Sequence, residues 1–313
     1  MKALVTGGFG FLGSHIVDLL VDNEVETYVL RSGFRSYKHP DLVNKNARVI
    51  QGNLLNPEVL NVATESIDVV FHCGSVLSHY AEAYPELAFD VNVKGTWNLK
   101  KACKQNKVKR IVFASTSFVY GDSEITPINE NAQLNPKGNF EVGKLSAEKI
   151  LQATHPFQVP YTILRLFNMY GPRSYPDELY SQVITTYILT ALKQESLEIH
   201  DDGTQELDFV YVKDVARAFC DCLSEKAENK IFNVGSGKST SINKLASTIN
   251  MLTNNLTPSH YNPNHPAYLK RVQADVRSIK ECIGWTPKYE LKEGLKETIS
   301  FFNEDRQYAQ KEN

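Results

Sequence analysis

The sequence lacks long apolar runs, paired cysteines and an excess of charge of either sign. No stretch of about 18 apolar residues occurs, so we expect no helix that crosses a bilayer. The five cysteines are an odd number without CxxC pairs, which argues against a zinc site or a secreted disulfide framework. The net charge of -2 gives the protein no overall electrostatic attraction to nucleic acid or to an anionic membrane. We therefore expect a cytoplasmic protein that uses neither as a partner.

Short β-prone and longer helical segments alternate along the first half of the chain. The 313 residues, 42% of them hydrophobic, are enough for a full core. Strands are predicted at about 2–6, 25–30, 47–51, 67–71, 109–114 and 161–167, and helices near 11–21, 57–63, 86–105 and 140–153. This alternation predicts an α/β fold in which helices cover a parallel sheet.

The regular alternation of strands and helices ends after Gly171-Pro172. A helix near 181–193, strands at 209–212 and 231–234 and two terminal helices follow. We predict a dinucleotide-binding domain at 1–168 and a smaller, mainly substrate-binding lobe at 169–313. Segments of about 210–235 are expected to return to the first domain.

A glycine-rich turn, TGGFGFLG at 6–13, stands between the first strand and the first helix. Gly7 allows the tight turn, Gly10 allows a pyrophosphate to approach, and Gly13 allows close packing of helix on sheet. The helix start at Phe11 and Leu12 offers free backbone amides to the phosphates. In this context the turn predicts a dinucleotide in a Rossmann-type, doubly wound sheet.

The second strand ends at Arg31 and not at an acidic residue. In dinucleotide-binding domains, a carboxylate at this place binds the free 2′-hydroxyl of the ribose. Arg31 and Arg35 are compatible with the extra phosphate of NADP, with stacking on the adenine, or with solvent. Asn53 is placed to bond an adenine edge or to serve as an ordinary loop residue. At the end of the fourth strand, His72 is expected to pack and Cys73 to line the cofactor site.

Further blocks extend the pattern over almost the whole chain: NVKGTWNL (92–99), STSFVYG (115–121), RLFNMYGPR (165–173), DFVYV (208–212) and FNVG (232–235). Together with the glycine turn, they resemble the extended short-chain dehydrogenases/reductases, and more narrowly the nucleotide-sugar epimerase/dehydratase family that includes enzymes like UDP-glucose 4-epimerase. The resemblance implies that NAD(H) is the cofactor, with NADP(H) the alternative suggested by Arg31. It also implies that the enzyme oxidises a sugar carbon, usually C4.

The same resemblance assigns site residues. It implies that Thr116 bonds the reacting oxygen and that Lys144 holds the nicotinamide ribose and stabilises a tyrosinate. Leu54, Asn92 and Ser115 are further expected cofactor contacts. Substrate contacts are expected at Asn168, Arg173 and Arg271, beside Thr116.

One catalytic position departs from the family. The tyrosine expected four residues before Lys144 is Phe140, which cannot carry a proton. Three explanations remain open. Phe140 is a deliberate change made to trap a substrate, or another group of the protein is the base, or the chain binds the cofactor without turnover. The candidates for another base are Thr116, Tyr120, His79 and Tyr80.

Other departures narrow the reaction. Ser117 and Phe118 occupy the positions of the Asp-Glu pair of the family's dehydratases, and Phe118 occupies the position of the Glu of its decarboxylases. Dehydration and decarboxylation are therefore disfavoured, and C4 epimerisation and C4 dehydrogenation remain. Leu207 replaces an arginine of many uridine- and thymidine-sugar enzymes, so a GDP- or CDP-linked hexose or heptose stays open.

Two other classes share the glycine turn: an NADP-dependent carbonyl reductase and a non-catalytic NAD(H)-binding regulator. No metal is expected, because the acidic residues around 200–214 have the spacing of a loop and a helix cap. The helices near 86–105 and 140–153 resemble the family's dimer contact, so we expect a homodimer or homotetramer.

Overall fold

The computed structural model describes residues 1–32, 43–176, 182–264 and 270–304, so Arg35 lies outside the described residues. Seven parallel strands form its large sheet in the order β10-β6-β5-β4-β1-β2-β3. They are β1 (Lys2–Thr6), β2 (Glu26–Arg31), β3 (Arg48–Gln51), β4 (Val69–His72), β5 (Arg110–Thr116), β6 (Tyr161–Leu166) and β10 (Lys230–Val234). The chain winds outward from β1 to β3 and then crosses to β4, so the carboxyl ends of β1 and β4 form the switch point where such sheets bind ligands. The predicted Rossmann-type α/β fold is confirmed.

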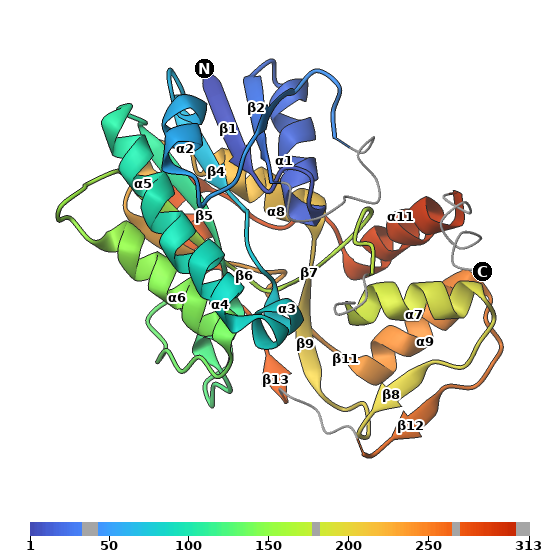
Figure 1. Ribbon diagram of the computed structural model, residues 1–313. Coiled ribbons are helices and arrows are strands. Elements are labelled where there is room, and N and C mark those ends of the chain that lie inside the picture. The colour runs from blue at the N-terminus through green and yellow to red at the C-terminus, as the bar shows by residue number, and fades with distance from the viewer. Residues whose placement is uncertain (33–42, 177–181, 265–269, 305–313) are drawn as a thin grey trace.

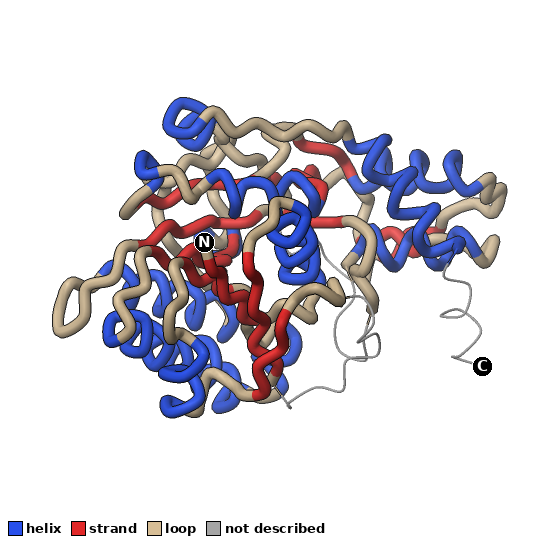
Figure 2. Tube along the Cα trace, turned by 90° about the horizontal axis from the view of Figure 1, so that it is seen from above, coloured by secondary structure: helices blue, strands red, loops and turns tan. Residues whose placement is uncertain are grey.

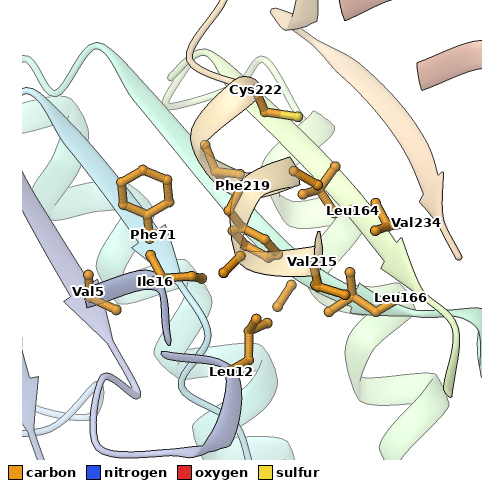
Figure 3. Packing of buried hydrophobic residues seen from close by; sticks show 14 of the residues in the cluster. Val5, Leu12, Ile16, Phe71, Leu164, Leu166, Val215, Phe219, Cys222 and Val234 are labelled. Carbon is orange, nitrogen blue, oxygen red and sulfur yellow. The ribbon is translucent and has the colours of Figure 1, made fainter. Parts of the chain in front are cut away.

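The side chains of the strands alternate between two apolar layers, as the period of two requires. Val5 and Phe71 pack with α1 (Phe11–Asp22), α8 (Val212–Asp221) and α10 (Arg277–Ile283). Figure 3 shows this layer between the sheet and α8. Leu4 and Val70 face the opposite way, toward α2 (Pro57–Ala63), α5 (Gly95–Gln105) and α6 (Asn139–Gln152). Figure 2 shows the strands of the sheet with helices on both sides.

The segment predicted as one helix at 86–105 is interrupted. It comprises α4 (Pro85–Phe89), a π-helical turn (Asp90–Lys94) and α5, and a short helix α3 (Ser78–Ala83) precedes it. Proline is favoured in the first turn of a helix, which explains the start at Pro85. The π-turn contains Asn92, whose side chain is tied to the loop after β4.

The C-terminal part builds a separate core around a second, smaller sheet (Figure 1). Its strands are β7 (Asn168–Tyr170), β9 (Glu206–Tyr211), β11 (Ser239–Ser241) and β13 (Arg271–Val272), with β8 (Glu198–His200) and β12 (His260–Asn262) paired beside it. Its helices α7 (Val183–Leu192), α9 (Ile242–Thr253) and α11 (Leu291–Glu304) share one apolar cluster.

The prediction for this part is wrong at three points. β9 begins at Glu206 instead of 209, and Val212 opens a helix, α8, that was not predicted and packs on the large sheet. Among the described residues, three helices, α9, α10 and α11, follow β10 instead of two. Short 3-10 turns occur at Ser117–Tyr120 and Glu225–Ala227. Among the described residues, no helix combines the length and apolar character needed to span a membrane.

Candidate functional site

The glycine turn joins β1 to α1 at the carboxyl edge of the large sheet. Gly7 has a φ of +72°, and a Cβ there would lie 2.7 Å from the backbone nitrogen of Gly74. A Cβ on Gly13 would collide with the carbonyl oxygen of Gly7. Gly10 is the N-cap and no side chain caps α1, so the first-turn amides remain open to a ligand. This helix start fits the diphosphate of a dinucleotide, whose charge the helix dipole favours.

A chain of hydrogen bonds braces this turn from beneath. The Gly74 N–H donates to Thr6 Oγ1 (3.1 Å), which lies 2.8 Å from His72 Nδ1. His72 Nε2 lies 3.0 Å from Thr96 Oγ1, whose hydroxyl donates to the Asn92 carbonyl oxygen (2.7 Å). Because the Thr96 proton is used in that bond, the His72 ring must carry its proton on Nε2 and accept on Nδ1. Burial lowers the pKa of His72 to about 3, so the neutral ring acts as a brace, not as an acid.

Asn92 holds the loop that follows β4. Its Oδ1 accepts from the Val76 N–H (2.8 Å) and from Ser75 Oγ (3.0 Å), and its Nδ2 donates to the Val76 carbonyl oxygen (2.9 Å). The side chain is therefore committed to this loop, and its contact with a cofactor stays a prediction. Cys73 opens the loop, and burial raises its thiol pKa to about 12, so the thiol stays protonated at neutral pH.

The adenosine end of the predicted site is basic and aromatic. The Arg31 guanidinium carbon lies 5.0 Å from the ring centre of Phe9 in the glycine turn, a cation–π contact. Asn53 Oδ1 accepts the Leu55 N–H (2.8 Å), which closes a turn within the loop. The Leu54 side chain belongs to the core beneath α2 and α5, so a cofactor contact there would have to come from its backbone.

Thr116, Phe140 and Lys144 mark the catalytic region of the family pattern. Thr116 ends β5, and its Oγ1 accepts the Phe118 N–H (3.2 Å). Phe140 lies in the first turn of α6 and is buried in a small apolar cluster with α3 and α4. Lys144, one turn later, holds its Nζ 4.6 Å from the ring centre of Phe113 and 5.9 Å from that of Phe140. Burial among these groups lowers the pKa of Lys144 to about 8.

A buried ion pair behind Lys144 was missed by the sequence analysis. Glu148 lies one further turn along α6 and takes two bonds from Arg165, at 3.0 Å from Nε and 2.8 Å from Nη2. Ser115 Oγ donates to the same carboxylate (2.5 Å), so the Ser115 hydroxyl points into this network. The signal in the sequence was the charge of Arg165 inside an apolar strand, together with the spacing of four from Phe140 to Lys144 to Glu148.

The structure removes Tyr120 from the candidate bases. Its hydroxyl donates to Asn233 Oδ1 (2.7 Å) and accepts from Arg165 Nη1 (3.0 Å). Burial raises the pKa of Tyr120 to about 12, so the phenol is held neutral within the fold. The other two side chains, His79 and Tyr80, lie on α3, the helix that packs against α6.

Two of the predicted substrate residues also contact other parts of the chain. Asn168 Nδ2 donates to the Asp208 carbonyl oxygen (3.2 Å), from β7 to β9. Arg173 Nη1 lies 2.6 Å from Asp18 Oδ2 on α1. Arg173 thus joins the chain after β7 to helix α1, and its contact with a substrate stays a prediction.

Arg271 offers an exposed cation on the second sheet. It pairs with Glu206 Oε2 at 3.3 Å, and β13 aligns it with Glu206 and Val272 with Leu207. Arg271 therefore lies one register position from Leu207, where the family pattern places an arginine, and the two side chains point to opposite faces of the sheet. Asp208 follows Leu207 on β9 and is buried. Its carboxylate accepts hydrogen bonds from Ser236 and from the backbone amides of Gly237 and Ala274, so its role is structural.

Comparisons with known proteins agree with this arrangement. Residues 3–235 match the NAD dependent epimerase/dehydratase family. A putative UDP-glucose 4-epimerase of Methanocaldococcus jannaschii is 32% identical over 302 residues, which cover 95% of this chain and 97% of the relative.

Solved structures are similar over nearly the full length. The UDP-glucose 4-epimerase of Thermotoga maritima, solved with UDP-glucose, has a TM-score of 0.92 at 30% identity and covers 98% of this chain and 100% of its own. A Thermus thermophilus UDP-glucose 4-epimerase in complex with NAD has a TM-score of 0.86 at 28% identity and covers 97% and 99%. With the glycine turn and the Thr116 and Lys144 positions in place, this chain belongs to the NAD dependent epimerase/dehydratase family.

Proposed function

We propose that this protein oxidises C4 of a nucleotide-linked sugar with NAD and returns the hydride, so that the net reaction is epimerisation. The observation that carries the proposal is the common placement of the glycine turn, Thr116 and Lys144 at the carboxyl edge of the large sheet. NAD, when bound, supplies a reversible hydride acceptor. Thr116 then bonds the reacting sugar oxygen, and Lys144 holds the nicotinamide ribose.

The residues after Thr116 support epimerisation over elimination or decarboxylation. Ser117 is buried in a 3-10 turn, and Phe118 packs against the cluster of Phe140. Neither side chain is a carboxylic acid that could exchange protons at sugar C5 or C6. Removal and return of a C4 hydride needs no such group.

The substrate side belongs to the same proposal. We place the nucleotide diphosphate near Asn168 and Arg271, whose exposed guanidinium offers a cation. A uridine-linked sugar is the first substrate to test, because two of the similar structures are UDP-glucose 4-epimerases.

Restoring the missing hydroxyl is the direct test. Phe140→Tyr should raise C4 epimerisation of UDP-glucose by about 10²- to 10⁴-fold, the usual contribution of a positioned general base. The measurement is conversion to UDP-galactose by chromatography, with NADH absorbance as a second readout.

Phe118→Tyr is the matched control, since it adds a hydroxyl to the neighbouring aromatic ring at a different position and should give no such gain. A Phe140→Tyr variant that binds NAD but oxidises neither UDP-glucose, UDP-N-acetylglucosamine nor UDP-glucuronate would contradict the proposal and favour a non-catalytic NAD(H)-binding role.

A further inference from the structure

The sugar hydroxyl must lose a proton when C4 is oxidised, and the usual acceptor is absent. The side chains near the end of β4 and β5 differ in their capacity to take it. His72 has both ring nitrogens engaged, and burial holds its pKa at about 3. Burial keeps the Cys73 thiol protonated by raising its pKa to about 12. Thr116 is an alcohol that can relay a proton but cannot keep one.

Lys144 is the lysine of α6 that lies beside these side chains and interacts electrostatically with His72 and Cys73, while His79 and Tyr80 of α3 are the competing candidates. Its Nζ lies above the rings of Phe113 and Phe140, and among the described residues no hydrogen bond or ion pair of the ammonium is found. Transfer of an ammonium from water into such surroundings disfavours the charged form. Burial accordingly lowers the pKa of Lys144 to about 8, within the range in which lysine serves as a base.

The charges around Lys144 explain why the amine is not locked as an ammonium. Glu148, on the same helix face, is the nearest carboxylate, but Arg165 of β6 binds both of its oxygens and Ser115 of β5 binds one. Its negative charge is therefore compensated by the guanidinium. His72 at the end of β4 and Cys73 directly after it both interact electrostatically with Lys144, and both are neutral at pH 7.

We infer that in this chain the Lys144 amine itself takes the proton of the sugar C4 hydroxyl, while Thr116 Oγ1 holds the sugar oxygen. The inference rests on the proposed function and names its base. The O–H electron pair becomes the second bond of the C4 carbonyl, the proton forms an N–H bond on Nζ, and the C4 hydride passes to NAD. The amine becomes an ammonium, and the reverse steps return proton and hydride.

A titration of the free protein tests the acid strength of Lys144 without any turnover. In nitrogen-15 NMR of lysine-labelled protein, the Nζ signal that disappears in Lys144→Met should titrate near pH 8, the value to which burial lowers its pKa. A midpoint above about 10, the ordinary range for lysine, would overturn the inference.

A kinetic profile tests the role. With UDP-glucose and NAD, single-turnover NADH formation by the unchanged chain should fall about 10-fold for each pH unit below the Lys144 midpoint, because only the neutral amine accepts a proton. Lys144→Arg keeps the charge permanently and should lose at least about 100-fold. Lys149→Arg, the same exchange on the exposed face of α6, is the matched control and should lose nothing.

The outcomes separate the inference from the proposed function. If the unchanged chain oxidises UDP-glucose with a flat pH profile, or equally well as Lys144→Arg, the inference fails and the proposed function stands. If Phe140→Tyr is active and the unchanged chain is not, the inference fails and the proposed reaction holds only for the restored variant. If Phe140→Tyr is inactive with all three UDP-sugars, the proposed function fails, and the base role fails with it. The pH profile and the titration use the unchanged chain, so neither depends on a variant that folds.

Discussion

At the scale of single residues, the buried pair of Arg165 and Glu148 has the largest expected effect on stability. Their side chains are 2% and 0% exposed. Arg165→Met would leave the Glu148 carboxylate in the core without its counterion, which should lower the free energy of unfolding by about 3–5 kcal/mol. Urea unfolding followed by circular dichroism measures the loss.

The double variant Arg165→Met with Glu148→Leu is the control for this expectation. Replacing both partners by apolar side chains removes the uncompensated charge, so most of the lost stability should return. A double variant as unstable as Arg165→Met alone would show that packing, and not charge, accounts for the effect.

Residue roles that depend on local pattern could be predicted from the sequence, and those that depend on distant contacts could not. The glycine turn needs only eight neighbouring residues, so its backbone role follows from TGGFGFLG. The bond between Thr6 and His72 joins residues 66 apart, and that between Ser115 and Glu148 joins residues 33 apart. Such partners meet only through the strand order. Tyr120 was considered as a base for the same reason, because its partner Asn233 is 113 residues away.

At the scale of elements, the start of α1 depends on how closely the helix approaches the turn from β1. Gly13→Ala would place a methyl group against the Gly7 carbonyl oxygen and push the helix away. The first-turn amides would move with it, so we expect NAD to bind at least about 10-fold more weakly by titration calorimetry.

Gly143→Ala serves as the control for this change. Its Cβ would meet Asn92 Cβ at 3.4 Å, an ordinary contact, and alanine favours the helix. This variant should bind NAD as the unchanged chain does. Equal weakening by both variants would contradict a specific role for the packing at Gly13.

Element types followed well from periodicity, while interruptions did not. The helices at 57–63 and 140–153 were predicted within one residue of α2 and α6, because each has a clear start and an apolar face. The segment 86–105 was predicted as one helix, since nothing local in it indicates the π-turn. That turn carries Asn92, whose bonds with Val76 join residues 16 apart.

At the scale of the whole molecule, the sequence pattern was sufficient for the layered α/β fold and for the expectation that segments of about 210–235 return to the first domain, but not for the order of the strands. β10 adds to the large sheet beside β6, and α8 packs on α1, whereas β9, which directly precedes α8 in the chain, belongs to the smaller sheet. Strand order of this kind depends on which edge remains free after β6 has paired. No short motif in 206–234 indicates that β10 joins this edge.

The last expectation concerns assembly of two copies. The outer faces of α5 and α6 form an apolar hollow lined by Val93, Trp97, Val142 and Leu145 among others. Val142, an apolar side chain in the first turn of α6, is 48% exposed and extends this apolar face to the surface. Two such helix pairs can close on one another about a two-fold axis, and a stable contact needs about 1,200–2,000 Å² of buried surface.

We therefore expect a dimer by size-exclusion chromatography with light scattering, and a shift toward monomer in Val142→Glu, because the carboxylate would be buried against its symmetry mate. NAD binding per chain should be retained, since Val142 lies outside the glycine turn. Leu256→Glu places the same charge at an apolar residue that is 93% exposed elsewhere on the surface and should stay dimeric. A chain that is monomeric at micromolar concentration, or a Val142→Glu variant that remains dimeric, would assign this face another role.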